Sequence, residues 1–264
     1  MDDRKKVEIE YYDKKAEEWL RQKKDQRSIT DFEGFDPNLL SSFSFCHEYL
    51  KDKCQNKKLL DYGCGNGVHS IFPAKCGAQV IGIDLSESSL KIAEERAKRE
   101  GVGNKVRFLA MDCEKMGFPG NYFDIIFDGG TFSSIDLNKA YSELSRILKP
   151  RGFLLGIETF GHNPFTNLKR KINKLIGKRT GWAAEHILKA KDMEKAKDYF
   201  NKVEVHYFHL FSWLAFPFLN FPGGKILLKI LETVEKPFLK MPFLNKYAFK
   251  VVFVFSDPKK LGIE

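Results

Sequence analysis

Three glycines alternate with other residues directly after a short apolar segment. The stretch LLDYGCGNGVHSI places Gly63, Gly65 and Gly67 two residues apart, with Asp61 just before them. Because glycine has no Cβ, the main-chain amides of such a loop can approach a ligand closely. The dinucleotide fingerprint does not fit because its third glycine position holds Val68, and a P-loop does not fit because no Gly-Lys-Ser/Thr follows. The spacing therefore predicts a ligand-binding loop of another type.

Acidic residues close several of the apolar segments that follow. Asp84 ends QVIGID, 17 residues after Gly67, while Asp112 follows VRFLAM and Asp128 ends FDIIFD. The carboxyl ends of parallel strands meet at one edge of a sheet, so we expect these acids near the glycine loop. A carboxylate in the place of Asp84 can accept hydrogen bonds from both hydroxyls of a ribose. The pattern predicts a nucleoside-binding crevice.

Short apolar segments alternate with helical stretches through the middle of the chain. We expect strands at residues 58–62, 79–84, 106–110, 123–128 and 152–158, with helices near 66–76, 87–101 and 136–148. Buried strands that alternate with helices predict a parallel sheet built from βαβ units. Residues 202–211 and 247–255 predict two further strands.

The two ends of the chain follow a different pattern. Helical spacing of apolar residues predicts one helix over about residues 5–24 and another that opens at Asp36 or Pro37 and ends near Lys51. The polar residues 160–200 predict about two helices. The expected divisions are amino-terminal helices in 1–56, a Rossmann-like core in 57–160, and substrate-side helices, an apolar insertion and the last strands, within the same domain, in 161–264.

Composition narrows the classes of function. The chain has 264 residues, 43% of them hydrophobic, and a net charge of +9 that favours an anionic partner such as nucleic acid, a membrane surface or a substrate. The five cysteines show no C-x-x-C spacing, so we expect no metal site. The charged start lacks a signal-peptide core, and no apolar run is long enough to span a bilayer. We expect a reduced, cytoplasmic protein, with peripheral membrane contact left open.

The ordered motifs resemble a known family. The pattern D-x-G-x-G-x-G, the acid that ends the second strand, and MDCEKMGFPGNYFDIIFDGG resemble the class I S-adenosylmethionine-dependent methyltransferases over about residues 8–160. The resemblance is strongest to the small-molecule branch that includes the ubiquinone and menaquinone C-methyltransferases. It implies S-adenosylmethionine as cofactor and an α/β, Rossmann-like, doubly wound sheet of seven strands in the order 3-2-1-4-5-7-6, the last strand antiparallel.

The resemblance also implies which residues bind the cofactor. They are Tyr12, Asp61, Gly63, Gly65, Gly67, Asp84, Leu85, Asp112, Cys113, Asp128 and Gly129. Asp61 and the glycine loop would hold the methionine part, Asp84 the ribose hydroxyls and Asp112 the adenine amino group. Leu85 would pack on adenine, and Asp128 with its neighbouring glycine would border the methyl donor.

For some of these residues a structural role is the alternative. Asp61 is also suited to capping the loop, and Asp112 to a surface turn. The segment YYDKKAEEW resembles the family's amino-terminal lid helix, so Tyr11 or Tyr12 would cover the cofactor. Both tyrosines are equally compatible with a place in the core. Asp84 has the weakest structural alternative, because it directly ends an apolar strand.

His162 is the first candidate for a catalytic base or an acceptor-binding group. It follows the expected fifth strand in IETFGHNPFTNLKR, where substrate-facing loops lie. The alternative is that His162 and Asn163 cap a helix beginning at Pro164. Related enzymes often carry Leu-His-His after the fourth strand, whereas this chain has GGTFSSID, which removes one possible base. His69 is assigned a structural role on the first helix of the sheet domain.

Residues 212–246 are the most apolar part of the chain. In a helix starting near Gly224, the polar residues form one narrow stripe consisting of Lys225, Lys229, Glu232 and Lys236. So wide an apolar face needs a partner: the domain itself, an apolar substrate, a second subunit or a membrane interface. A basic block precedes it and is expected on the same side, either as a solvated face or as a binding surface, namely Lys169, Arg170, Lys171, Lys174, Lys178 and Arg179.

The leading hypothesis is therefore a methyltransferase that acts on a small acceptor, with lipid-linked or anionic acceptors included. One alternative is a tRNA or rRNA methyltransferase, motivated by the net charge but disfavoured because DGGT replaces the Asn-Pro-Pro-Tyr type of motif. Another is a non-catalytic scaffold that binds the cofactor. The sequence does not name the acceptor atom or the oligomeric state.

Overall fold

The strands of the molecule form a single sheet. They are β1 (Lys58–Tyr62), β2 (Gln79–Asp84), β3 (Val106–Ala110), β4 (Phe123–Asp128), β5 (Leu148–Thr159), β6 (Phe200–Phe208) and β7 (Lys250–Pro258). The structure, a computed structural model, describes residues 2–21, 39–175 and 180–260. The first four strands have the bounds expected from the sequence. The fifth is longer, because it begins four residues before Gly152.

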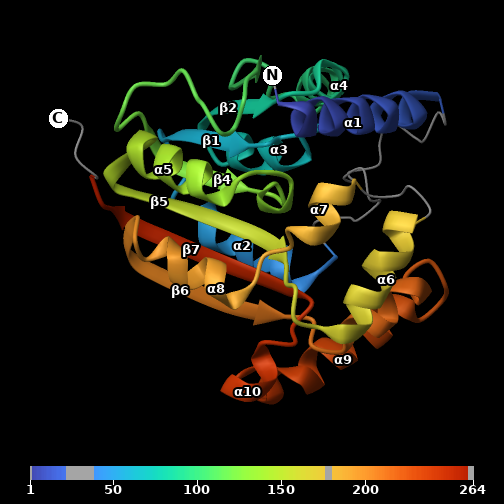
Figure 1. Ribbon diagram of the computed structural model, residues 1–264. Coiled ribbons are helices and arrows are strands. Elements are labelled where there is room, and N and C mark those ends of the chain that lie inside the picture. Colours follow the sequence, from blue (N-terminus) through green and yellow to red (C-terminus); the bar gives the residue numbers. More distant parts are fainter. Residues whose placement is uncertain (1, 22–38, 176–179, 261–264) are drawn as a thin grey trace.

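The strand order confirms the doubly wound arrangement expected from the sequence. The seven strands follow the order β3-β2-β1-β4-β5-β7-β6 (Figure 1). Strands β1 to β5 pair in parallel, and β7 runs antiparallel to both β5 and β6. The carboxyl ends of the parallel strands therefore share one edge, where ligands bind in this class of sheet.

Helices cover both faces of the sheet. They are α1 (Asp3–Arg21), α2 (Ser41–Lys51), α3 (Val68–Lys75), α4 (Glu87–Arg99), α5 (Leu137–Ile147), α6 (Pro164–Leu175), α7 (Gly181–Glu185), α8 (Ala190–Ala196), α9 (Gly224–Leu239) and α10 (Pro242–Asn245), with 3-10 helices η1 (Phe132–Ser134) and η2 (Ser212–Phe218). The described part of residues 160–200 thus holds three helices where the sequence predicted about two. The expected start of the second helix at Asp36 or Pro37 lies outside the described residues.

The core has two layers because successive strand residues point to opposite faces. Leu60 and Tyr62 of β1 belong to a cluster that includes Tyr141 of α5 and reaches α8. Their neighbour Leu59 belongs to the other cluster, which α2 and α3 complete through residues such as Phe43. Both faces of the central strands are buried, which explains why these strands are continuously apolar rather than alternating.

Helix α9 turns its acidic side toward the interior, which corrects the expectation of one polar stripe. Its lysines are exposed, but Glu232 and Glu235 are buried. Side chains expected to need a covering partner are instead open to solvent, with Ile226 67%, Ile230 54% and Val234 50% exposed. The helical periodicity is therefore confirmed, Glu232 is not part of an exposed polar stripe, and the domain leaves much of the apolar side of α9 uncovered.

Several classes of site are absent from the described part of the chain. No helix there is long and apolar enough to cross a membrane. No group of three or more His, Cys, Asp or Glu side chains is placed to hold a metal ion within the same residues. All five cysteines are free thiols.

Candidate functional site

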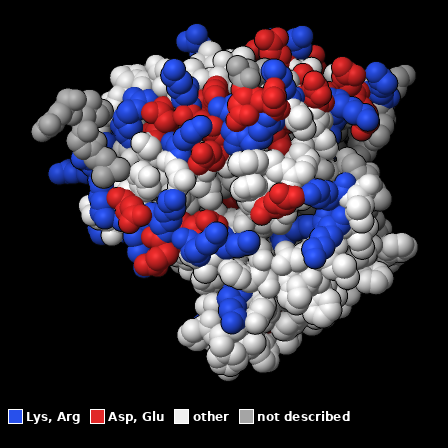
Figure 2. All heavy atoms as spheres, viewed as in Figure 1, with Lys and Arg blue, Asp and Glu red and all other residues white. Residues whose placement is uncertain are grey.

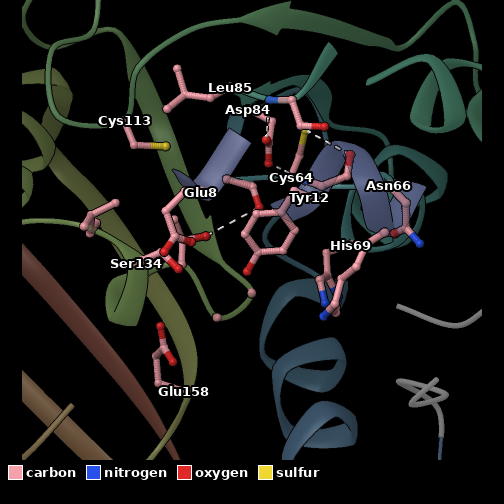
Figure 3. Close-up of a pocket in the computed structure, with 18 of the residues that line it drawn as sticks. Glu8, Tyr12, Cys64, Asn66, His69, Asp84, Leu85, Cys113, Ser134 and Glu158 are labelled. Atoms are coloured by element: carbon pink, nitrogen blue, oxygen red, sulfur yellow. Dashed lines mark hydrogen bonds between the residues drawn. The ribbon is translucent and has the colours of Figure 1, made fainter. Parts of the chain in front are cut away.

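A pocket opens at the carboxyl edge of the sheet, beneath α1. Residues following β1, β2 and β3 line one side of it, including Gly65, Asp84 and Cys113. Figure 3 shows that Glu8 and Tyr12 of α1, Asp84 and Leu85 at the end of β2, and His69 of α3 surround the same cavity. Eight of the predicted cofactor residues line it: Tyr12, Gly63, Gly65, Asp84, Leu85, Asp112, Cys113 and Gly129.

The glycine loop has two positions at which only glycine fits, Gly63 and Gly67. Gly63 has a φ of +65°, and a Cβ there would lie 2.1 Å from Oγ1 of Thr131. Thr131 in turn donates a hydrogen bond from Oγ1 to the Tyr62 carbonyl oxygen at 2.9 Å. Gly67 has a φ of +72°, and its Cβ would lie 2.7 Å from Cβ of Ala93 in α4. The loop therefore packs tightly between β4 and α4, which holds its amides in place.

Asp84 links the glycine loop to the start of α4. Its Oδ2 accepts a hydrogen bond from the Gly65 amide at 2.9 Å, and its Oδ1 accepts one from the Ser86 amide at 2.9 Å. Burial beneath α1 raises the pKa of Asp84, while these amide donors oppose that rise. The carboxylate is thus held rigidly at the pocket wall, where a ligand hydroxyl can share it.

The end of β3 supplies a second acidic wall, and α1 is bound to it by ion pairs. Lys5 Nζ lies 2.5 Å from Asp112 Oδ2 and 2.9 Å from Glu114 Oε2, and Arg4 also pairs with Glu114. Burial alone would raise the pKa of Glu114, but hydrogen bonds from the Asp136 amide, Lys5 and Arg4 hold it below its usual value. These contacts fix the amino-terminal turn of α1 over the pocket.

Two further contacts hold α1 in place along its length. The Ser86 hydroxyl donates a hydrogen bond to Asp13 Oδ1 at 2.6 Å. The hydroxyl of Thr180, at the start of α7, donates a hydrogen bond to Glu8 of α1. Tyr12 lies between these two contacts and lines the pocket, whereas Tyr11 does not. The position of α1 over the pocket is that of a lid.

Three predicted cofactor residues lie behind the pocket wall. Asp61 is almost fully buried and accepts a hydrogen bond from the Ser70 hydroxyl at 2.5 Å. Asp128 is fully buried and accepts from the Thr131 amide at 3.0 Å. Gly67 packs on α4 as described above. In this structure, all three shape the wall rather than face the cavity.

His162 lies outside the pocket, which corrects its expected place at the site. Its Nε2 accepts a hydrogen bond from the Ala190 amide at 3.1 Å, so it caps the first turn of α8. Burial and the nearby Lys189 charge lower the pKa of His162. The helix that begins at Pro164 is capped instead by Asn163, whose Oδ1 accepts from the Phe165 and Thr166 amides at 3.0 and 3.2 Å.

The described residues of the basic block do not form one exposed surface. Arg170 is buried and donates to Asn167 Oδ1 at 2.6 Å and to the Phe160 carbonyl oxygen at 3.3 Å, so it has a structural role. Lys171 and Lys174 are exposed. The side chain of Lys169 and residues 178–179 lie outside the described residues.

The side of the pocket toward β5 and β7 contains residues that the sequence analysis did not assign to the site, including His69, for which it expected a structural role. Phe43 of α2, His69, Glu158 and Lys250 all line it. His69 packs directly against Gly129, where a Cβ would lie 2.5 Å from the ring, and it stacks on Phe43 with ring centroids 5.2 Å apart. Burial lowers the pKa of His69 to about 3, so its imidazole is neutral.

Only Glu158 could have been found from its sequence position. It ends the segment 152–158 in which the sequence predicts a strand, as Asp84 ends the segment 79–84, and it accepts a hydrogen bond from the Phe132 amide at 2.6 Å. Burial, together with the nearby Glu158, raises the pKa of Asp128 well above its usual value. Phe43 and Lys250 reach the pocket from helices and strands distant in sequence, and no local signal marks them.

Comparison with known proteins agrees with this arrangement. Residues 60–156 match the family model described as "Methyltransferase domain". These residues form a methyltransferase domain. The domain comprises β1 to β4, most of β5 and the helices between them, and it therefore holds the glycine loop and the acids at the strand ends.

Similar proteins include C-methyltransferases of diverse organisms. The chain is 31% identical to a sterol 4-C-methyltransferase of Caenorhabditis elegans over 40% of its length and 33% of the relative's. It is 38% identical to a sterol 24-C-methyltransferase of Gibberella zeae over 36% of its own length and 26% of the relative's length. It is 33% identical to a demethylmenaquinone methyltransferase of Bacteroides fragilis over 39% and 43%. The chain thus spans less than half of the length of these relatives.

Solved structures extend the likeness to most of the chain at the level of fold. A geranyl diphosphate C-methyltransferase from Streptomyces coelicolor has a TM-score of 0.57 with 17% identity and covers 81% of this chain and 79% of its own. A phosphoethanolamine N-methyltransferase of Haemonchus contortus has a TM-score of 0.57 with 20% identity and covers 81% and 53%. The likeness in fold therefore extends well beyond residues 60–156.

Proposed function

We propose that this protein transfers a methyl group from S-adenosylmethionine to a small, largely apolar acceptor. The observation that carries the proposal is the meeting of the glycine loop, Asp84 and Asp112 around one pocket within a methyltransferase domain. No observation favours the nucleic-acid alternative.

The donor set of the pocket fits the cofactor. Asp84 offers carboxylate oxygens beside the loop for a ribose, and Leu85 offers an apolar surface for adenine. Asp112 and the Cys113 amide follow on the next strand for the adenine edge. Gly63 and Gly65 keep the loop backbone accessible for the methionine part. Asp61 and Asp128 support this wall from behind, so their proposed contribution is indirect.

Bound S-adenosylmethionine would supply an electrophilic methyl group, and the protein's task is to align the acceptor with it. Phe43 and Ile157 give the acceptor side of the pocket an apolar lining, while Lys250 contributes a cation there. His69 is neutral, and its Nδ1 has no hydrogen-bond partner among the described residues. We assign to His69, in place of His162, the role of binding the acceptor through a hydrogen bond of its neutral imidazole.

The acceptor class follows from this lining and from the relatives. By their names, the relatives act on sterols and demethylmenaquinone, and one structural neighbour acts on geranyl diphosphate. An apolar molecule with one polar end would match Phe43, Ile157 and Lys250. Within this class, we propose a lipid-linked acceptor.

Calorimetric titration of the protein with S-adenosylhomocysteine tests the cofactor assignment. Saturable binding with one site per chain is expected, and NAD⁺ should not compete. Absence of binding to S-adenosylhomocysteine, or displacement by NAD⁺, would overturn the proposal.

A further inference from the structure

A group of helices at one end of the molecule exposes large apolar side chains in regular rows. Along α6 they are Phe165, Leu168, Ile172 and Leu175, which share one side of the helix. Along α9 they are Ile226, Ile230, Val234 and Phe238, each one turn beyond the last. Phe218 of η2 and Phe243 of α10 are exposed beside them. We call this surface the α6–α10 face.

The exposed charges on the α9 and α10 part of this face have one sign, whereas Lys174 of α6 pairs with the exposed Glu185 of α7. Residues 209–249 are all described and contain two carboxylates, Glu232 and Glu235, both of which are buried. The same residues expose five lysines, Lys225, Lys229, Lys236, Lys240 and Lys246. Residues 160–184 contain no Asp or Glu. In Figure 2 the lower part of the molecule, where Figure 1 places α9 and α10, shows blue and white spheres without red.

Buried hydrogen bonds fix the apolar side of α9 outward. Glu235 accepts hydrogen bonds from the amides of His209, Phe211 and Ser212 at 2.8 to 3.0 Å and from the Ser212 hydroxyl at 2.8 Å. Glu232 accepts from the Ser41 amide at 2.9 Å. Removing these carboxylates from the interior would leave several amides unpaired, so α9 cannot rotate its apolar side inward at low cost. The exposure is therefore specified by the sequence.

The helices of the face are joined to one another and lie on the pocket's side of the sheet. Phe165 of α6 and Trp213 of η2 have ring centroids 6.3 Å apart, and Asn163 Nδ2 donates to the Tyr247 carbonyl oxygen at 2.9 Å. Thr159, which ends β5, lines the pocket, and α6 begins five residues later at Pro164. The face is thus continuous with the edge of the sheet at which the pocket opens.

We propose that the α6–α10 face binds the surface of an anionic lipid bilayer. Apolar rows flanked by lysines are the pattern of helices that lie in the membrane interface, where the lysines meet anionic headgroups. A second copy of the chain fits less well, because a two-fold contact through this face would bring its lysines against each other without exposed carboxylates to pair them. The inference does not rest on methyl transfer, although it would place the pocket where a lipid-linked acceptor resides.

Flotation with lipid vesicles tests the proposal directly. The full chain, without cofactor, is mixed with vesicles of phosphatidylcholine alone or of phosphatidylcholine with phosphatidylglycerol. Co-flotation with the anionic vesicles is expected, with less on neutral vesicles and less again at high salt. Because no methyl donor is present, this outcome is separate from whether the proposed activity is correct.

Paired variants assign the contact to named residues. Ile230→Glu should reduce vesicle binding strongly, whereas Leu20→Glu, at a similarly exposed apolar position on α1 (47% against 54%), should not. Lys236→Gln and Lys240→Gln should each reduce binding about fivefold, the effect of one basic residue near an anionic surface. Lys53→Gln, at an exposed lysine two residues beyond the end of α2, is the matched control. Unchanged thermal melting of each variant shows that folding is intact.

Three results would overturn the proposal. The first is that no vesicle composition floats the protein. The second is that Ile230→Glu and Leu20→Glu behave alike. The third is a concentration-dependent dimer in light scattering that Ile230→Glu dissociates, which would assign the face to a second copy of the chain.

Discussion

At the scale of single residues, the role of each acid at the edge of the sheet depends on whether its side chain faces the cavity. Asp84 faces it and holds the glycine loop through the Gly65 amide. Asp61 stands only two residues before that loop but is buried behind it against Ser70. The same residue type therefore faces the cavity in one place and supports the cavity wall in the other. His69 and His162 differ in the same way, because the first lines the pocket and the second caps α8.

Asp84→Ala tests the assignment of the ribose site. Removing the carboxylate deletes charge-assisted hydrogen bonds, so binding of S-adenosylhomocysteine should weaken by about 2 kcal/mol or more. Isothermal calorimetry gives the difference. Asp124→Ala is the matched control, because Asp124 lies at the opposite edge of the sheet and accepts from the Lys58 amide. If Asp84→Ala and the wild type bound S-adenosylhomocysteine with equal affinity, the assignment of the ribose site to Asp84 would be wrong.

Asp61 should make stability depend on pH. Burial raises the pKa of Asp61 from 3.8 to about 7, so the folded state holds a proton that the unfolded state releases. Its stabilising contribution is complete below about pH 4 and is lost as the pH rises toward 7. Urea unfolding should therefore show the wild type losing stability across this window relative to Asp61→Asn. Parallel curves for the two proteins would contradict the assignment.

At the scale of elements, the sequence predicted the strands well and the roles of the surrounding helices less well. Strands β1 to β4 are marked locally by apolar runs ending in acids or glycine. The buried side of α9 could not be predicted from local sequence. This side carries Glu232 and Glu235, whose carboxylates accept hydrogen bonds from backbone amides of distant segments. A hydrophobic pattern identifies the faces of a helix but cannot reveal partners that only the fold brings close. For the same reason, no sequence pattern marked Phe43 and Lys250 as residues of the pocket.

Helix α1 should move when its ion pairs are weakened. Arg4→Gln removes a partly buried pair with Glu114, so amides along α1 should exchange hydrogen faster and S-adenosylhomocysteine should bind about 1 kcal/mol more weakly. Lys6→Gln is the control, since Lys6 forms only an exposed pair with Asp3. Hydrogen exchange followed by mass spectrometry measures the effect. Equal exchange in both variants would show that the Arg4–Glu114 pair does not hold α1.

The docking of α9 should depend on the buried carboxylate of Glu235. Glu235→Gln replaces one acceptor oxygen by an amide donor, which leaves amides of residues 209–212 poorly paired. Urea unfolding should show a loss of about 1–3 kcal/mol. Glu204→Gln, at an exposed position on β6, should cost far less. Equal stability of the two variants would remove the physical reason given for the exposed side of α9.

At the scale of the whole molecule, a methyltransferase domain carries the proposed cofactor side, and the segments outside it supply much of the acceptor side and the α6–α10 face. Phe43 and Lys250 lie outside residues 60–156. The relatives match 36–40% of this chain, so the acceptor must be found by experiment.

Transfer of labelled methyl from S-adenosylmethionine is the measurement that tests the central claim most directly. The protein is incubated with the labelled donor and a total extract of the source cells, and the products are separated into lipid, polar and nucleic-acid pools. A His69→Ala variant that retains S-adenosylhomocysteine binding is run beside the wild type. We expect label in the lipid pool, reduced by His69→Ala. Cofactor binding without label in any pool, or label in the nucleic-acid pool alone, would contradict the account.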